Sequence, residues 1–375
     1  MDSDASLDWL ALAMTPGLGS RLAGKLLRQF GSPGQIFHAS LTELEACRIT
    51  AAAAQAIHDR RAHKDAEEEL ARVQKLGCCL LNWDEPEYPK RLLEIYDPPP
   101  LLYVRGDAAV LNRHSISMVG TRRPTPYGNQ VAERLGRDLA ERGLTIVSGM
   151  ARGIDSSAHT GACQASQGAA IGVLGNGVDV IYPKENRKLF GAVERRGALI
   201  SEFPFGTHPA PENFPVRNRV VAGMSLGTIV VQGAQYSGSL ITARLAMEFS
   251  REVYGVPGNI TVDVSFAPNQ LIKQGAKLVT SWEDVVEELP TEVRAELFEV
   301  QTTTREERAS LLAEELSPTQ KKVYGLLGVD DAVHVDELVE KAELSSSEVL
   351  AALCELEMKG IVRQMPGKQF VKSLL

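Results

Sequence analysis

One pattern, repeated four times between residues 116 and 231, restricts the fold of this chain more than any other feature. In each repeat an apolar run lies beside a glycine and a group of polar or basic residues. The four segments read SISMVGTRRPTPYG, LTIVSGMARGID, IGVLGNGVDVIYPKEN and PVRNRVVAGMSLGTIVVQG. Glycines at the ends of buried strands allow backbone N–H groups to approach an anion closely. The repetition therefore predicts strand ends that together form an anion-binding crevice.

Strand and helix patterns alternate from residue 116 to residue 256, which is typical of an α/β protein with a doubly wound, Rossmann-like parallel sheet. We expect strands near 116–119, 144–147, 169–173, 198–201, 228–231 and 252–256, with helices between them that include 128–142 and 240–250. A further strand at 101–104 is expected to join the same sheet. Open parallel sheets bind ligands beyond the carboxyl ends of their strands, so the loops that follow these strands are the candidate site.

Smaller modules flank this domain, and the predicted segments are an N-terminal helical module (1–76), the Rossmann-like domain (77–290), a linker (291–316) and a winged-helix-like domain (317–375). In the first module, leucines at helical spacing surround the turn Pro16-Gly17-Leu18-Gly19. A PGLG turn between apolar helices resembles a helix–hairpin–helix (SAM-like) module, whose hairpin amides can contact nucleic-acid phosphates. A plain helical packing module with a tight turn is the alternative reading of the same residues.

The C-terminal segment shows the order helix, helix, helix and hairpin, which is that of a winged-helix module. Such modules usually bind duplex DNA through their third helix. Here that helix carries Glu348, Glu355 and Glu357 against Lys359, and this charge would repel phosphate. Residues 291–375 as a whole hold 16 Asp and Glu against 10 Lys and Arg. A protein contact or a packing role is therefore favoured over DNA binding for this module.

The net charge of −8 does not exclude nucleic acid, because the acidity is concentrated at the C-terminal end. The five cysteines are odd in number and form no CxxC pair, and the acidic N-terminus has no basic region of a secretory signal. No apolar run approaches the roughly 20 residues that a membrane span needs. We expect a reduced, cytoplasmic protein without a membrane segment. The seven histidines show no metal-ligand spacing, so no metal is expected.

Motifs that would indicate an enzyme or a cofactor are incomplete. The stretch GSRLAGK resembles a P-loop, but Leu26 stands where Mg²⁺ coordination needs Ser or Thr. GTRRPTPYG after the first strand is not the GxGxxG of a dinucleotide site. Asp155 and His159 lie four residues apart near Ser148 and Ser156, but no GxSxG surrounds either serine. We therefore expect no cofactor and no catalytic residue.

The first candidate anion ligand is Arg122, which follows Gly120-Thr121 at the end of a strand. A guanidinium in that position can bind a phosphate through two parallel hydrogen bonds. Lys184, in YPKEN after the third strand, could add a second positive charge.

Two further groups of polar residues have two readings each. Helical or alternate spacing allows only one of Arg217 and Arg219 to face the crevice easily, and a structural salt bridge is the alternative for this pair. Asn218, between them, could hydrogen-bond a base or a backbone turn. The hydroxyls of Ser237 and Ser239 precede a helix, where they suit an anion, but the same loop could merely cap that helix.

Taken in order, seven motifs resemble the DprA/Smf family of DNA-processing proteins: VGTRRPTPYG, SGMARGIDSSAH, LGNGVDVIYPKEN, ISEFPFG, NFPVRNRVVAGMS, SGSLITARLAMEFSREVYGVPGN and NQLIKQGAKLV. The resemblance covers residues 85–285 densely, and both flanking modules match common family architecture. It implies a cytosolic bacterial protein that binds and protects incoming single-stranded DNA during natural transformation. It also implies help in loading the recombinase RecA onto that strand, and no turnover chemistry.

The resemblance also implies roles for individual residues. The family's phosphate-binding arginine falls on Arg122, in a GTR that stands where GSR is common, and other family motifs fall on Lys184 and on 217–219. Family members dimerise through the late part of the Rossmann-like domain. This would place Leu271, Ile272 and Leu278 near a contact between two copies, unless they belong to the core. The full set expected to bind DNA is Gly120, Thr121, Arg122, Ser148, Gly149, Gly177, Lys184, Arg217, Asn218, Arg219, Ser237 and Ser239.

Aromatic side chains could stack on bases, and the candidates are Tyr127, Tyr182, Phe203 and Tyr236. The competing function is enzymatic: a nucleotide-processing Rossmann-like protein, similar in outline to the phosphoribohydrolases that activate cytokinins. Those enzymes carry a PGGxGT-type motif and a catalytic glutamate, whereas the corresponding stretch here, QGAQYSGSLITA, has no acid. A third reading leaves the crevice empty and gives the binding role to the acidic C-terminal module.

Overall fold

The computed structural model describes residues 3–297, 316–328, 332–358 and 361–372. The chain divides into two compact units, Met1–Arg294 and Ala295–Leu375. Within the described ranges, no helix combines the length and the apolar character that crossing a membrane requires.

The first unit is built on a sheet to which the described residues contribute nine strands, in the spatial order β1-β2-β6-β5-β4-β3-β7-β8-β9. The strands are β1 (Cys79–Asn82), β2 (Leu101–Gly106), β3 (Ser115–Val119), β4 (Thr145–Ser148), β5 (Ala170–Val173), β6 (Ala198–Ser201), β7 (Gly227–Val230), β8 (Glu252–Gly255) and β9 (Lys277–Leu278). From β6 to β9 all neighbours are parallel. At the other edge, β2 pairs antiparallel with β6, and β1 pairs antiparallel with β2.

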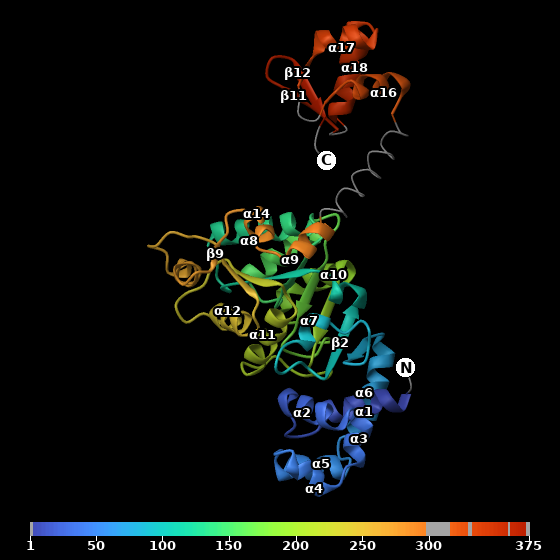
Figure 1. Ribbon diagram of the computed structural model, residues 1–375, viewed down its shortest axis with the longest axis vertical. Coiled ribbons are helices and arrows are strands. Elements are labelled where there is room, and N and C mark those ends of the chain that lie inside the picture. The colour runs from blue at the N-terminus through green and yellow to red at the C-terminus, as the bar shows by residue number, and fades with distance from the viewer. Residues whose placement is uncertain (1–2, 298–315, 329–331, 359–360, 373–375) are drawn as a thin grey trace. The chain divides into compact units, whose positions relative to one another are not determined.

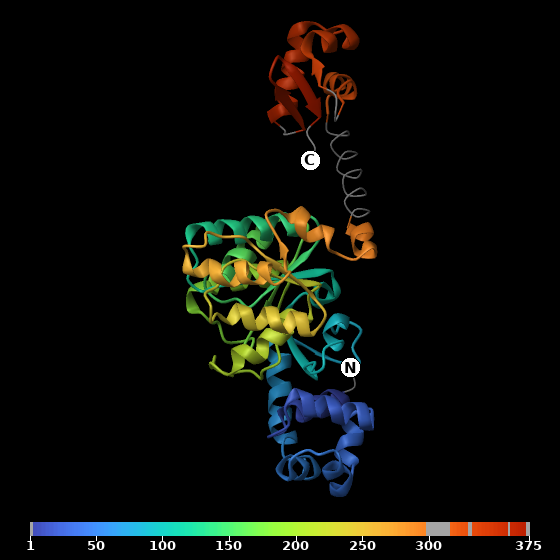
Figure 2. The same cartoon turned by 60° about the vertical axis from the view of Figure 1, so that its left-hand side comes forward.

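Helices cover both faces of this sheet, as Figures 1 and 2 show, with α8 and α9 on one face and α11 and α12 on the other. Their bounds are α7 (Lys90–Leu93), α8 (Pro126–Ala140), α9 (Ile154–Gln164), α10 (Arg187–Arg196), α11 (Asn213–Gly223), α12 (Gly238–Glu248), α13 (Phe266–Lys273) and α14 (Trp282–Glu287). Short 3₁₀ turns lie at η1 (Ala108–Asn112), η2 (Lys184–Asn186) and η3 (Asp263–Ser265). The prediction of a doubly wound sheet is confirmed, with an antiparallel pair added at one edge.

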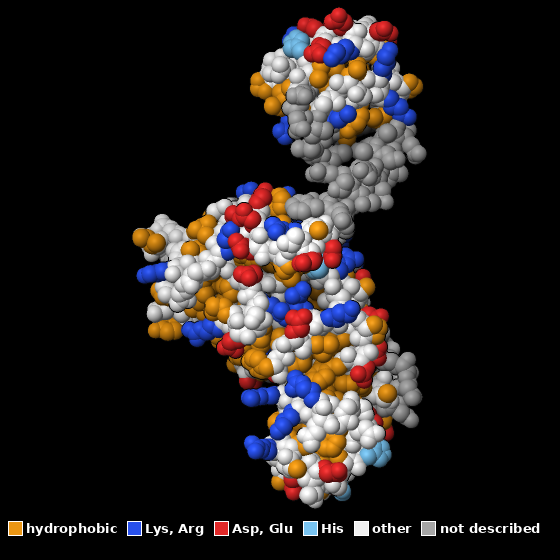
Figure 3. All heavy atoms as spheres, viewed as in Figure 1, with side chains coloured by type: hydrophobic (Ala, Val, Ile, Leu, Met, Phe, Trp, Pro, Cys, Tyr) orange, Lys and Arg blue, Asp and Glu red, His pale blue; other side chains and the backbone are white. Residues whose placement is uncertain are grey.

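The N-terminal module is helical and belongs to the same compact unit as the sheet. Its helices are α1 (Ser3–Met14), α2 (Ser20–Phe30), α3 (Pro33–His38), α4 (Leu41–Ala46), α5 (Ala51–His58) and α6 (His63–Leu76). Buried Glu69 of α6 accepts a hydrogen bond from the backbone N–H of Phe205 at 2.6 Å, and the rings of Trp9 and Trp83 lie 6.3 Å apart. The space-filling view in Figure 3 shows Lys and Arg side chains gathered on this module around α2.

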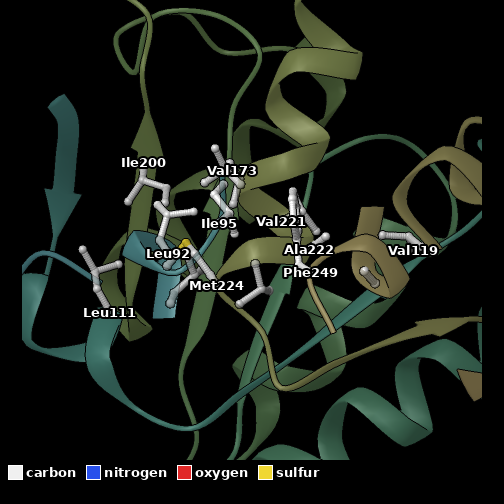
Figure 4. Close-up of a cluster of buried hydrophobic side chains, with 14 of the residues drawn as sticks. Leu92, Ile95, Leu111, Val119, Val173, Ile200, Val221, Ala222, Met224 and Phe249 are labelled. Carbon is white, nitrogen blue, oxygen red and sulfur yellow. The ribbon is translucent and has the colours of Figure 1, made fainter. Parts of the chain in front are cut away.

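The core of the sheet follows from its apolar strands, because parallel strands covered on both faces are buried along their whole length. All five residues of β3 are buried. The α7 segment adds Leu92 and Ile95, which pack over Gly223 at the end of α11. Figure 4 shows these two side chains in the cluster that contains Val173, Ile200 and Met224.

The second unit has the winged-helix arrangement. Helices α16 (Pro318–Gly325), α17 (Val335–Ala342) and α18 (Ser346–Met358) accompany a sheet of β10 (Val333–His334), β12 (Gln369–Lys372) and β11 (Val362–Met365), in that spatial order. Leu338, Val349, Leu353 and Phe370 belong to its core. The third helix, α18, contains no Lys or Arg and exposes Glu348, Glu355 and Glu357. Lys359, the cation that follows these acids in the sequence, lies outside the described residues.

Only the two ends of the predicted linker, 291–316, lie within the described residues. Residues 291–297 are helical, and Val293 and Leu297 are buried. Leu316 is buried in the core of the second unit. Residues 298–315 lie outside the described ranges, so the linker boundaries stay a prediction.

Candidate functional site

A cavity of about 480 Å³ opens at the point where the strand order of the sheet reverses. From β3 the chain builds outward through β4, β5 and β6 on one side, and β7 and β8 lie on the other. The chain leaves β3 toward α8 and β7 toward α12, on opposite faces of the sheet, and the crevice opens between these two connections, which is where doubly wound sheets bind ligands. We call this cavity the switch-point crevice. Its walls include Gly120, Thr121, Arg122, Arg123, Ala151, Asp155, Phe214, Arg217, Asn218, Ser237, Ser239 and Thr242.

Glycine is required at two of the strand ends because neighbouring groups come too close for a side chain. A Cβ on Gly120 would lie 2.5 Å from Cγ1 of Ile154 and 2.7 Å from the carbonyl oxygen of Gln232. A Cβ on Gly149 would collide with the guanidinium of Arg217. The missing side chains at these two glycines thus leave space for neighbouring groups. At Gly149 the space is occupied by the guanidinium of Arg217, which lines the crevice.

Arg217 places a buried positive charge in the crevice wall. Its side chain comes from α11 and the residue is only 6% exposed. Nη1 donates to the carbonyl oxygen of Val173 at 2.7 Å, while Nε is buried and has no hydrogen-bond partner among the residues the structure describes. Burial lowers the pKa of Arg217, and the nearby carboxylate of Asp155 opposes that shift. The side chain is thus a desolvated cation with unused hydrogen-bonding capacity.

Asp155 is the buried counter-charge. Its Oδ2 accepts hydrogen bonds from the backbone N–H groups of Gly149 at 3.1 Å and Ala151 at 3.3 Å. Burial raises the pKa of this carboxyl, and the positive charge of Arg217 acts in the opposite direction. Its polar contacts therefore tie the carboxylate to the loop after β4.

Arg122 lies at the mouth of the crevice and is exposed. Its Cζ is 5.0 Å from the ring centroid of Phe214, a distance within cation–π range. The Phe214 ring in turn stacks on Tyr182, with centroids 5.9 Å apart and planes inclined by 28°. The crevice is therefore bordered by a guanidinium that lies over one ring of a stacked aromatic pair.

Sequence reasoning missed Phe214, although it included Tyr182 among the aromatic candidates. Phe214 precedes Arg217 by three residues on α11, and residues at this spacing lie on the same helix face. That spacing is the signal that could have found it. Of the other aromatic candidates, Tyr127 donates a hydrogen bond to the carbonyl oxygen of Pro257 at 2.9 Å, and Tyr236 is 93% exposed. Phe203 lines a different cavity.

Several other predicted residues reach the crevice. Thr121, Asn218, Ser237 and Ser239 all line it together with Gly120. The Oγ of Ser237 accepts a hydrogen bond from the backbone N–H of Ser239 at 3.1 Å and caps α12. The capping reading is confirmed, and because the capped helix begins at the cavity wall, an anion contact by these hydroxyls stays a prediction.

Besides Arg219, four predicted residues do not line the crevice: Gly149, whose Cα faces the guanidinium of Arg217, and Ser148, Gly177 and Lys184. The buried hydroxyl of Ser148 donates to the carbonyl oxygen of Met118 at 2.6 Å, across the sheet. The N–H of Gly177 donates to the carbonyl oxygen of Thr207 at 3.0 Å, so it already has a partner. Lys184 is exposed on η2, outside the cavity lining. Their strand ends lie at the same edge of the sheet, but these polar groups are not aimed into the cavity.

Arg219 belongs to a separate ionic cluster. It is 5% exposed and forms ion pairs with Asp97 at 3.2 Å and Glu202 at 2.5 Å. Its Nη2 also donates to the hydroxyl of Ser20 at 3.0 Å, in the N-terminal module. The structural salt bridge that the sequence left open is thus realised for Arg219, and we leave this residue out of the proposed DNA-binding set.

The buried Asp155–His159 pair offers no catalytic constellation. His159 is fully buried, and burial lowers its pKa to about 4, so the imidazole is neutral at physiological pH. Among the parts of the chain that the structure covers, no group of three His, Cys, Asp or Glu side chains could hold a metal ion.

The three dimer candidates differ in exposure. Leu271 is part of the hydrophobic core and Ile272 is half-buried. Leu278 is 42% exposed and lies on β9, the last strand of the sheet at that edge. Of the three, Leu278 offers the most surface to a second copy.

Comparison with known proteins connects this geometry to a family. Residues 79–290 match the model of the family described as DNA recombination-mediator protein A, and residues 307–368 match that of the DprA winged helix domain. The chain belongs to the DprA/Smf family. A protein Smf from a Synechocystis species is 32% identical in an alignment 393 residues long. The alignment covers 96% of this chain and 97% of that relative.

Two solved DprA structures resemble this chain. DprA from Streptococcus pneumoniae matches with a TM-score of 0.68 and 32% identity, over 76% of this chain and 98% of that one. DprA from Helicobacter pylori, studied for its single-stranded DNA binding mode, matches with a TM-score of 0.51 and 31% identity. That match covers 56% of this chain and 93% of the other. Every residue of the switch-point crevice lies within the part of the chain that the DprA/Smf family model matches.

Proposed function

We propose that this chain binds single-stranded DNA in the switch-point crevice and acts by binding rather than by turnover. The observation that carries the proposal is the convergence of two unlike guanidiniums on one cavity. Arg217 supplies a desolvated charge with a free Nε, and Arg122 supplies an exposed charge at the mouth. A phosphate between them would gain charge-assisted hydrogen bonds on two sides.

The aromatic border favours a nucleotide over a bare phosphate. Phe214 lies beside Arg122 and stacks on Tyr182, and a base splayed from a single strand can stack on such rings without regard to its identity. A cavity of about 480 Å³ suits a nucleotide-sized group. Binding should therefore depend weakly on sequence and strongly on salt. The DprA structure from Helicobacter pylori, which was studied for its single-stranded DNA binding mode, supports the same reading.

For the enzymatic alternative, the carboxylate among the described residues that line the crevice is that of Asp155. The carboxylate of Asp155 accepts two backbone hydrogen bonds, and the imidazole of His159 is fully buried. A phosphoribohydrolase-like reaction needs a carboxylate free to act on the sugar, and neither group fits that role.

Family membership supports the finer parts of the proposal. We infer that the chain acts in the cytoplasm, protects incoming single-stranded DNA during natural transformation, helps load RecA onto the strand, and works as a homodimer. Leu278, exposed on β9, fits a contact between two copies. A dimer would present two crevices to one strand, which raises avidity without new contacts at either site.

The proposal is tested by fluorescence anisotropy of a labelled oligothymidylate across a salt series. We compare wild type with Arg122→Ala and with Arg113→Ala, which removes an exposed arginine outside the cavity lining. Arg122→Ala should lose most of the binding, and Arg113→Ala should bind like wild type. Equal binding by all three proteins would rule out the crevice as the DNA site. A wild type that does not bind would end the single-stranded DNA proposal.

A further inference from the structure

A second and larger cavity, of about 670 Å³, lies between the N-terminal module and the sheet domain. We call it the module-side cavity. Its walls include the start of α2 from Ser20 to Leu22, together with Tyr96, Asp97, Glu202 and Arg219. Both cavities lie within the same compact unit of the protein.

The two cavities are neighbours. Pro215, in the first turn of α11, lines both of them. On α12, Ile241 lines the switch-point crevice, and Leu245, one turn further along, lines the module-side cavity. A chain that leaves the crevice across Pro215 would therefore enter the module-side cavity directly.

The module-side cavity contains two carboxylates, Asp97 and Glu202, and Arg219 offsets one of their two negative charges. Asp97 and Glu202 both pair with that arginine, and Glu202 also accepts a hydrogen bond from Ser20 at 3.1 Å. The exposed Arg21 supplies a second cation at the same wall, so the charges of the cavity lining balance. Across residues 3–297, no carboxylate lies within ion-pair distance of Arg21.

From Arg21 a basic stripe continues along α2. Lys25 and Arg28 follow at four and seven residues, so all three side chains lie on one helix face, and all three are exposed. The Nζ of Lys25 donates to the carbonyl oxygen of Cys47 at 2.7 Å, and the guanidinium of Arg28 lies 6.0 Å from the ring of Trp83. Neither forms an ion pair with any described carboxylate. The opposite face, with Ala23, Leu26 and Leu27, is buried. In Figure 3 this region of the surface carries a concentration of Lys and Arg.

An aromatic ring accompanies these charges, as in the switch-point crevice. Tyr96 lines the module-side cavity and is 53% exposed, and its ring lies 5.3 Å from that of Phe249. A ring supported from one side and open on the other can receive a base. Cations and an aromatic ring thus occur in both cavities.

We propose that the module-side cavity and the basic face of α2 form a second binding segment for the same single strand. The strand would cross Pro215, place a base against Tyr96, and continue with its phosphates along Arg21, Lys25 and Arg28. The N-terminal module is then part of the DNA-binding surface. This inference rests on the proposed function of the switch-point crevice.

The test compares a short oligothymidylate that occupies only the crevice with a long one that reaches α2. The variant is Arg21→Gln/Lys25→Gln/Arg28→Gln. The matched control, Lys64→Gln/Lys75→Gln/Arg113→Gln, removes three exposed cations that line neither cavity. Each phosphate contact with a single strand contributes about 0.7 to the slope of log K against log salt, so losing three contacts should reduce that slope by about 2.

We expect this reduction for the α2 variant on the long oligonucleotide only, with wild-type behaviour on the short one and in the control variant. An α2 variant with the same salt slope as the control on the long oligonucleotide would overturn the second segment, while the loss of binding in Arg122→Ala would still uphold the crevice. Failure of wild type to bind either oligonucleotide would instead overturn the proposed function itself, and the second segment with it.

Discussion

Two regions of this molecule each bury an arginine from the same helix, and they use it in opposite ways. Arg217 and Arg219 are two residues apart on α11, and they are 6% and 5% exposed. In the switch-point crevice, no described carboxylate lies within ion-pair distance of Arg217, and its Nε has no partner among the described groups. In the module-side cavity, Arg219 forms ion pairs with two carboxylates and donates a hydrogen bond to a serine hydroxyl.

The difference shows that burial alone does not tell a structural arginine from a binding one. A buried charge is costly unless it is paired and hydrogen-bonded. Arg219 meets that requirement within the protein. Arg217 meets only part of it, so an anion that completes its bonding would recover part of the desolvation cost. The number of partners around each guanidinium therefore separates the two roles, and identical substitutions at both sites test that distinction.

The largest effect on stability is expected from Arg219→Met. The variant would leave Asp97 and Glu202 without their common cation, and removing one partner of a buried ion pair typically costs about 3–5 kcal/mol. Chemical denaturation of wild type and variant measures the difference. The folded variant should still bind a short oligothymidylate like wild type. A loss of stability below about 1 kcal/mol would contradict the structural role of Arg219.

Arg217→Met should give the reverse pattern. It removes a charge whose burial is only partly compensated, so its cost in unfolding free energy should be smaller than that of Arg219→Met. Losing a charge-assisted hydrogen bond to phosphate costs about 1.5–3 kcal/mol, which corresponds to roughly 10- to 100-fold weaker binding. Anisotropy titrations and denaturation of the same two variants check both statements. If Arg217→Met proved the less stable protein and kept its affinity, the roles of the two arginines would be exchanged.

Much of this arrangement could be predicted from the sequence, for physical reasons. Buried parallel strands read as continuous apolar runs, which is why β3 to β8 fall close to their expected positions. The glycines mark where those strands end, and they placed the crevice correctly at the carboxyl edge. The spacing of Arg217 and Arg219 also indicated that only one of them could face the crevice.

Which arginine faces the crevice could not be predicted, because the answer depends on residues far away in the chain. Asp97 is 122 positions from Arg219 and meets it only through the tertiary fold. The same limit applies to Gly177, whose N–H is taken by Thr207 from another loop. A glycine at a strand end allows close approach, but the sequence does not show which group approaches.

The smallest expected effect concerns Phe214, the aromatic residue that lies beneath Arg122 at the mouth of the crevice. Phe214→Leu removes the ring beneath Arg122 and beside Tyr182. An exposed cation–π contact is worth about 0.5–1 kcal/mol, so binding should weaken about two- to fivefold. The matched control is Tyr236→Leu, because that tyrosine is 93% exposed and lines neither cavity. Anisotropy with the short oligothymidylate compares the two. Unchanged affinity in Phe214→Leu, or an equal loss of affinity in Tyr236→Leu, would show that the aromatic pair does not orient Arg122. Binding in the crevice would then depend on the guanidiniums alone.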